Sequence, residues 1–272
     1  MSSYLNSAVT EHRLKLFEKE KERQRRLITD VHKITVQYRD HPEHCTLIMN
    51  KKLSTPYDCA RHVSQLVGDR AVLAEADPFY ANRAFWRSCS LMLGSVLENS
   101  FKSKFYVQLC SFPAPNVRTG SFVYDVDLGI DWTPTKEELR MLSAQMVRLS
   151  MQKLPFERLS VKWYAQRLLF HILINPSKID GSAGDEVTVY RVGRFLDMSC
   201  GPLMANTAQL GRVTITAVHP LPSASSRRLH RVQGVALPHS ILMNHFSYSI
   251  LEKRARKLNE GRIPDLVAMG LS

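Results

Sequence analysis

The segment His41-Pro42-Glu43-His44-Cys45 carries three side chains of the kind that bind zinc. Imidazole nitrogens and thiolates are common ligands of Zn²⁺, and a structural site usually draws them from two half-sites with characteristic spacing. No second half-site with such spacing is present elsewhere in the chain. The sequence therefore predicts no metal site.

Asp125 and Asp127 alternate along a short apolar segment, so both carboxylates lie on one face of the predicted strand. Paired carboxylates can act as a general acid and a general base. At the end of a short strand beside Tyr124, however, carboxylates more often fix a turn or form a local ion pair. We favour this structural interpretation.

Motifs that bind phosphate or supply a nucleophile are missing from the sequence. Gly181 and Gly184 are not followed by Lys-Ser/Thr and do not join a strand to a helix, which excludes a P-loop. The chain has no Gly-x-Ser-x-Gly either. We therefore predict that the protein is not an enzyme, needs no cofactor and takes no small-molecule substrate.

The chain is strongly basic. Its 37 Lys and Arg residues outnumber 25 Asp and Glu residues, which gives a formal charge of +12 and a pI near 9.6. A surplus of this size favours a polyanionic partner such as RNA, because each neutralised phosphate releases counterions. Charge alone does not separate an RNA-binding protein from other basic proteins.

Two basic clusters stand near the end of the chain, one after a Pro/Ser loop and one at the end of the last predicted helix. Aromatic residues are not interleaved with them, so we expect contacts to phosphates rather than base-specific reading. The alternative is that the second cluster is a solvated helix end whose cations complement the helix dipole. The candidate RNA contacts are Arg227, Arg228, Arg231, Arg254 and Lys257.

Cysteine spacing and hydropathy indicate in which kind of compartment the protein resides. The five cysteines are odd in number, widely spaced and without a Cys-x-x-Cys pair, which favours a reducing compartment over a disulfide scaffold. No apolar run approaches the roughly 20 residues of a membrane span, so we expect no membrane contact. Neither a signal peptide nor an Arg-rich transit peptide is legible in the first ten residues.

Hydrophobic periodicity predicts interleaved helices and strands, which is typical of an α+β fold. A helix dense in charges of both signs is expected over residues 11–27, either as a solvated helix or as an arm that orders on RNA or a protein neighbour. The other predicted helices span residues 54–67, 82–101, 133–153, 163–173 and 238–258. Strands are predicted at residues 33–38, 45–50, 105–110, 121–128, 186–192, 211–218 and 228–235.

Three segments in this order resemble the editing domain, the second additional domain, of threonyl-tRNA synthetase. They are FWRSCSLMLGSVLENSF at 85–101, TGSFVYDVDL at 119–128 and RVGRFLDMSCGPLMANT at 191–207. In the family the first is a helix with His-Ser-x-x-His, the second a Gly-Phe-Tyr-Tyr-Asp strand and the third a Cys-Arg-Gly-Pro-His turn. The resemblance implies an editing-domain-like α+β core.

This sequence departs from the family where the hydrolytic side chains belong. The two helix positions hold Arg87 and Leu91, and the two turn positions hold Ser199 and Leu203. A leucine can neither bind a metal nor accept a proton. The resemblance therefore implies a degenerate editing site on a retained scaffold.

The segment at residues 31–76 resembles the small TGS domain that precedes the editing domain in the synthetase. It is short, because residues 73–80 lead almost directly into the long predicted helix where the family has further strands. We expect a truncated TGS-like module, a β-hairpin plus helix. The implied division is a basic N-terminal helical arm at 1–30, this module at 31–80, the degenerate core at 81–236 and a basic C-terminal helix and tail at 237–272.

Most of residues 11–257 resemble a family of mitochondrial large-subunit ribosomal proteins related to threonyl-tRNA synthetase but lacking its aminoacylation core. The segments STPYDCA, FWRSC, GDEVTVYRVGRFLDMSCGPL and RRLHRVQGVALP carry this resemblance. It implies a non-catalytic structural role in the mitochondrial matrix, with large-subunit rRNA and neighbouring ribosomal proteins as partners. The alternatives are a free-standing editing hydrolase and a tRNA-binding module outside the ribosome.

Overall fold

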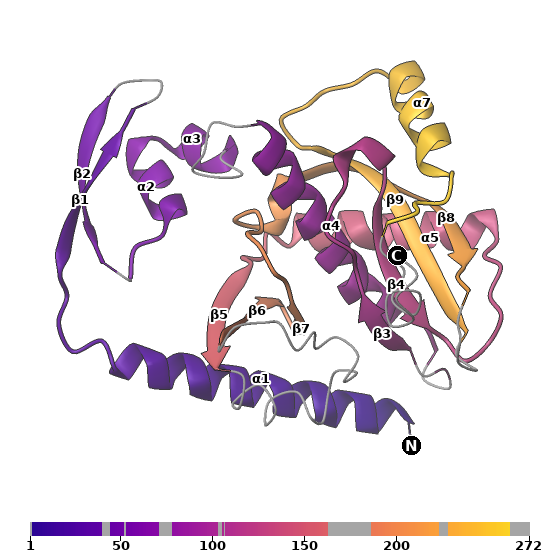
Figure 1. Ribbon diagram of the computed structural model, residues 1–272, viewed down its shortest axis with the longest axis horizontal. Helices are drawn as coiled ribbons and strands as arrows, with labels where there is room; N and C mark the ends of the chain where they lie inside the picture. Colours follow the sequence, from indigo (N-terminus) through magenta and orange to yellow (C-terminus); the bar gives the residue numbers. More distant parts are fainter. Residues whose placement is uncertain are drawn as a thin grey trace.

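The computed structural model describes residues 2–39, 44–51, 53–70, 78–102, 105, 107–162, 186–222 and 228–261. The described strands form three antiparallel sheets with the strand orders β1-β2, β3-β4-β9-β8 and β5-β6-β7, and helices pack beside them (Figure 1). This mixture confirms the predicted α+β class. The helices are α1 (Ser2–Arg26), α2 (Pro56–Val63), α3 (Gln65–Arg70), α4 (Pro78–Ser100), α5 (Lys136–Met151) and α7 (His245–Ala255). The strands are β1 (Lys33–Tyr38), β2 (Cys45–Asn50), β3 (Gln108–Ser111), β4 (Phe122–Asp127), β5 (Glu157–Lys162), β6 (Glu186–Val192), β7 (Phe195–Met198), β8 (Leu210–Pro220) and β9 (Leu229–Pro238).

Helix α4 is the centre of the molecule. Nearly every side chain from Ala84 to Leu97 is buried, because the helix has sheet on more than one side. Phe85, Cys89 and neighbouring residues pack with the inward side chains of the four-stranded sheet, while Leu91 packs with β6 and β7. A helix that is apolar around its whole circumference is typical of such a buried position.

Helix α5 lies against α4 and β8 and closes the same side of the four-stranded sheet. It begins at a capping box, in which the Thr135 side chain accepts from the Glu138 backbone and the Glu138 carboxylate accepts from the Thr135 backbone. Leu142 and Met146 face the core. The other side of the sheet is covered by α7, whose Tyr248 packs on Val235 of β9.

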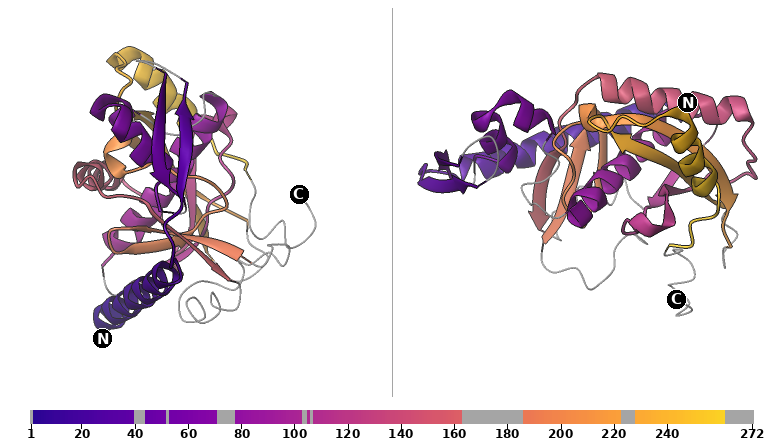
Figure 2. Two further views of the ribbon diagram at one scale, coloured as in Figure 1. Left: turned by 90° about the vertical axis from the view of Figure 1, so that its left-hand side faces the viewer. Right: turned by 90° about the horizontal axis from the view of Figure 1, so that it is seen from above.

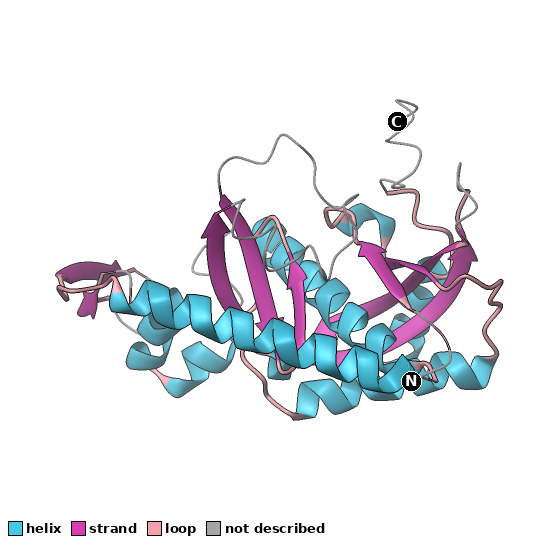
Figure 3. Cartoon of the chain, turned by 90° about the horizontal axis from the view of Figure 1, so that it is seen from below, coloured by secondary structure: helices cyan, strands magenta, loops and turns pink. Residues whose placement is uncertain are grey.

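Helix α1 runs along the three-stranded sheet (Figures 1 and 3). Phe17 is 2% exposed and packs in one apolar cluster with Leu159, Val189 and other residues of that sheet. The Arg191 guanidinium lies 5.0 Å from the centre of the Phe17 ring. The helix therefore contacts its own sheet through a narrow apolar stripe, while most of its charged residues are exposed, as the solvated-helix interpretation expects.

The β1–β2 hairpin with α2 and α3 projects from the rest of the molecule (Figures 1 and 2). Its two strands pair antiparallel from Lys33 opposite Asn50 to Tyr38 opposite Cys45, over the predicted residues. Thr55 caps α2 in a second capping box with Asp58. A two-stranded sheet is marginal by itself, so this unit depends on its helices for an apolar face.

Several predicted boundaries were wrong. The second helix breaks at Ser64, which has extended backbone angles, and Gly68 lies inside α3 instead of ending the helix. Pro238 ends β9, and α7 begins only at His245, capped by Asn244. Strands β5 and β7 were not predicted at all. The helix predicted at 163–173 lies outside the described residues.

Candidate functional site

The fold brings the four degenerate positions into one place. Arg87 and Leu91 are one turn apart on α4, and the turn that follows β7 carries Ser199 and Leu203. The Arg87 Nη1 donates a hydrogen bond of 3.0 Å to the carbonyl oxygen of Pro202. The helix and the turn are therefore in direct contact.

Apolar side chains fill the centre of this place. Leu91 is fully buried and Leu203 nearly so, and both belong to one cluster with Tyr190, Val192 and Phe195. Close-packed leucines leave no polar group that could bind a metal or take a proton from water. The packing at this position stabilises the junction of α4 with β6 and β7.

The two polar positions have no catalytic partner either. Burial and the neighbouring Arg83 lower the pKa of Arg87, yet a guanidinium stays protonated at neutral pH and cannot act as a base. The Oγ of Ser199 is buried and makes no hydrogen bond among the described residues. A serine hydroxyl needs an adjacent base to become a nucleophile, and none is hydrogen-bonded to it.

Two tyrosine hydroxyls stabilise this junction. Tyr124 of β4 donates a hydrogen bond to Oδ2 of Asp197 at 2.5 Å, in the buried space between the two larger sheets. Burial and the Asp197 carboxylate raise the pKa of Tyr124 well above its ordinary value, so the phenol stays a donor. Tyr190 donates to the carbonyl oxygen of Gly201 at 3.1 Å and fixes the turn.

Gly201 is needed for the contact between the turn and α4. A Cβ at this position would lie 2.6 Å from the Arg87 guanidinium carbon. No side chain fits there unless Arg87 moves away.

Arg231 corrects one of the predicted RNA contacts. It is fully buried and faces Asp125 across the β4–β9 pair, with Nε and Nη2 each 2.7 Å from a carboxylate oxygen. A side chain with no exposed surface cannot reach a phosphate. The interpretation that Asp125 forms a local ion pair is confirmed, and Asp127 fixes a turn by accepting from the backbone of Gly129.

The buried pair extends into a polar network that the sequence did not indicate. Arg231 Nη1 also donates to the carbonyl oxygens of Asn259 and Gly261, at 2.6 and 2.8 Å. Gln233 Nε2 donates to the carbonyl oxygens at the end of α7, and its Oε1 accepts from the backbone of Asn259 at 3.1 Å. In the sequence, the only signal of this network was Gln233, a glutamine inside an apolar strand. The network fastens the chain after α7 to β9.

The other basic candidates are on the surface. Arg228 is exposed and pairs with Asp131, and Arg254 is exposed and donates to the carbonyl oxygen of Arg118. Lys257 is exposed just beyond α7, whereas Arg227 lies outside the described residues. His230, which lies between Arg228 and Arg231 in the sequence, is buried.

The two basic segments are linked through β8. His219 of β8 pairs with Arg231 of β9, three residues after Arg228, and its Nε2 lies 3.1 Å from the carbonyl oxygen of Arg256 at the end of α7. Arg228 lies at the end of β4, where its backbone N–H donates to the Asp127 carboxylate, whereas Arg254 lies beside Arg118 and Gly120, before the start of that strand.

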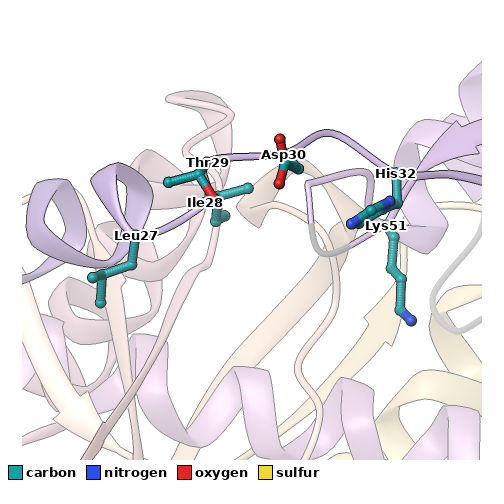
Figure 4. A pocket seen from close by; sticks show the side chains of 6 residues that line it. All are labelled: Leu27, Ile28, Thr29, Asp30, His32 and Lys51. Atoms are coloured by element: carbon teal, nitrogen blue, oxygen red, sulfur yellow. The ribbon is translucent and has the colours of Figure 1, made fainter.

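The described residues give little evidence for a metal site, a membrane span or a ligand pocket. No group of three or more His, Cys, Asp or Glu side chains there is arranged to hold a metal ion, and His41 lies outside them. Within the same ranges, none of the helices combines the length and apolar character of a membrane span. A shallow hollow lies between the end of α1 and the β1–β2 hairpin, and Figure 4 shows that apolar, polar and charged side chains line it. Its lining residues are Leu27, Ile28, Thr29, Asp30, His32 and Lys51.

Comparison with known proteins identifies the family of the chain. No protein-family model matches the chain. The large ribosomal subunit protein mL39 of Drosophila melanogaster is 38% identical over 292 aligned positions, which cover 96% of this chain and 88% of the relative. The chain belongs to the mL39 family. Its relative over nearly the full length is thus a ribosomal protein and not an enzyme.

The mL39-family chain is also similar to threonine–tRNA ligases. It is 25% identical to the probable cytoplasmic threonine–tRNA ligase 1 of Dictyostelium discoideum, across 79% of this chain and 33% of the ligase. It is 26% identical to the mitochondrial threonine–tRNA ligase of Homo sapiens, across 70% of this chain and 29% of the ligase. The chain therefore spans about a third of each of these ligases.

The alignment with the Drosophila mL39 protein has more positions than this chain has residues, 292 against 272. The relative therefore has residues inside the matched region that this chain lacks.

Proposed function

We propose that the protein is a non-catalytic structural constituent of the mitochondrial large ribosomal subunit, located in the mitochondrial matrix. It binds the rRNA of that subunit and neighbouring ribosomal proteins. The observation that carries the proposal is the 38% identity to a large ribosomal subunit protein over 96% of the chain. The similarity to a mitochondrial threonine–tRNA ligase supports the compartment.

The scaffold of this proposal is a degenerate editing-domain-like core over residues 81–236, preceded by a truncated TGS-like module over 31–80. Similarity to the ligases across most of the chain supports this origin. The hairpin with α2 and α3 supports the smaller module. Residues 1–30 and 237–272 are the basic arm and the basic C-terminal helix and tail.

The filled editing position supports the absence of catalysis. Leu91 and Leu203 replace side chains that could take part in hydrolysis, and they are packed into the core. Similarity to the ligases therefore reflects a shared scaffold. A free-standing editing or tRNA-binding module is not favoured, because the relative matched over nearly its full length is a ribosomal protein.

The rRNA contacts that we propose are Arg228, Arg254 and Lys257, with Arg227 as a fourth from the sequence alone. The three described residues are exposed. Phosphate contacts from such side chains fix a protein on a phosphate backbone without reading bases.

Sedimentation of a tagged copy from a mitochondrial lysate tests the proposal. The protein is expected to migrate with the large ribosomal subunit and to leave it at high salt or after RNase treatment, because phosphate contacts weaken as counterions accumulate. A protein that stays at the top of the gradient would contradict it. A tagged established large-subunit protein, run in parallel, controls for the integrity of the subunit.

A further inference from the structure

Helix α7 has an outer face that the described part of the chain leaves uncovered. The helix packs on β9 and β8 with Tyr248 and Leu251 (Figures 1 and 2). On the opposite side Phe246 is 76% exposed and Ile250 is 52% exposed. Residues four apart lie on one face of a helix, so these two side chains form one stripe.

The segment just before the helix adds further exposed apolar side chains. Leu242 is 96% exposed and Ile241 is about half exposed, while the adjacent Met243 turns inward to the cluster around Tyr248. Single exposed apolar residues are ordinary, but several that adjoin one another on one element mark an interaction site. We call Ile241, Leu242, Phe246 and Ile250 the apolar stripe of α7.

The stripe ends at a cation. Lys253 is exposed and lies seven residues after Phe246, which places it on the same face of the helix one turn beyond Ile250. The only carboxylate of α7, Glu252, accepts a hydrogen bond from Thr214 at 2.8 Å on the sheet side. The outer face is therefore apolar along most of its length and positive at its C-terminal end.

We infer that this face binds an amphipathic segment of a neighbouring ribosomal protein, with apolar side chains on the stripe and a carboxylate at Lys253. The inference rests on the proposed function and adds the surface and the chemistry of one partner. RNA is a poorer fit, because within the stripe only Phe246 offers a π-face to a base, whereas Ile241, Leu242 and Ile250 offer neither a π-face nor a charge to a phosphate. An acidic amphipathic segment satisfies both the apolar and the cationic part.

Site-specific photocrosslinking identifies the occupant. A benzophenone amino acid replaces Phe246 in the full-length tagged chain, which is expressed in cells, illuminated and separated on a gradient. We expect a cross-link to another protein of the large subunit, mapping to an amphipathic segment that contains Asp or Glu. A cross-link to rRNA, to a second copy of this chain, to a segment without carboxylates, or to nothing would overturn the inference.

Binding of the mapped segment then tests the chemistry. A synthetic peptide of that segment is expected to bind the Phe246→Ala and Lys253→Glu variants at least about tenfold more weakly than the unmodified chain. The control Met141→Ala removes a similarly exposed apolar side chain from α5 and should bind unchanged. Replacing the peptide carboxylates by lysine should restore binding to Lys253→Glu. Equal affinity for all variants would overturn the inference.

The gradient separates this inference from the proposed function. If the chain sediments with the large subunit but Phe246 links to rRNA, only the inference fails. If the chain stays free of the subunit yet links to an acidic amphipathic segment, the surface assignment holds and the proposed function fails.

Discussion

Asp125 and Arg231 form a bidentate ion pair across β4 and β9, with both side chains completely removed from solvent. Charges can be buried in this way only if their hydrogen bonds are made, because desolvation costs several kcal/mol for each ion. Arg231 meets this condition by also donating to the carbonyl oxygens of Asn259 and Gly261. The pair therefore joins the sheet to the segment that follows α7.

Replacing Arg231 by Met should destabilise the protein by about 3–5 kcal/mol, because it leaves the Asp125 carboxylate buried without a partner. Urea denaturation measures the loss. The double variant Asp125→Leu/Arg231→Met should recover much of it, since no unpaired charge remains. Arg228→Ala is the matched control, because Arg228 is exposed and should change stability by no more than about 0.5 kcal/mol. A loss as small as that of the control would contradict the structural role of Arg231.

Leu91→Ala should cost about 2–5 kcal/mol, because the side chain is fully buried against Tyr190, Phe195 and Leu203. Leu203→Ala should be smaller, and the double variant less than additive, because both deletions enlarge one cavity. Thermal or urea unfolding measures these values, with the exposed Met141→Ala as control. Full additivity would show that the two leucines do not share a cavity.

The purified protein should not remove amino acids from aminoacyl-tRNA. None of the side chains at Arg87, Leu91, Ser199 and Leu203 combines a proton acceptor with a hydrogen-bonded nucleophile. Incubation with mischarged tRNA, using a threonyl-tRNA synthetase as the positive control, checks this expectation. Turnover above the rate without protein would require a site elsewhere in the chain.

The attachment of α1 should weaken in acid. Burial raises the pKa of Glu157, but hydrogen bonds from Lys21 of α1 and from Arg191 outweigh it and leave the pKa below its ordinary value of 4.5. A lowered folded-state pKa means that the stabilisation is complete above 4.5 and is lost as the pH falls through the lower, folded-state value.

Hydrogen exchange of the α1 amides at neutral and at acidic pH measures this loss. The Glu157→Gln variant cannot ionise at this position, so its α1 should be less protected at neutral pH and should depend less on acid. The same acid dependence in the variant would assign the effect to other groups.

The triple variant Arg228→Ala/Arg254→Ala/Lys257→Ala should weaken association with rRNA at every salt concentration. Its slope of log affinity against log salt should fall by up to about 2–3, because each phosphate contact contributes close to one. Filter binding to large-subunit rRNA measures both quantities. The control removes three exposed cations of α1, Lys15, Lys19 and Arg26. An equal effect of the two triple variants would indicate dispersed charge instead of a defined surface.

Local chemistry made much of the fold predictable. The β1–β2 hairpin matched its predicted residues, and two helices begin within three residues of their predicted starts at 54 and 133, because caps and alternation act within a few residues. The α+β class followed from the same patterns. Pairing partners decide whether a short segment becomes a strand. β5 was missed because its partner β6 is distant in the sequence, and β7 was missed because the turn that joins it to β6 obscured its pattern.

For the candidate site too, some properties follow from the sequence and others only from the tertiary structure. The sequence by itself determined that Arg87, Leu91, Ser199 and Leu203 carry no hydrolytic side chains, because residue type alone decides whether a proton can be accepted. It also determined the basic character of the chain. Only the tertiary structure decided that Arg231 lies inside the protein while Arg228 lies outside, and that α1 rests on its own sheet through Phe17. Charge is a property of a residue, whereas exposure is a property of everything packed around it.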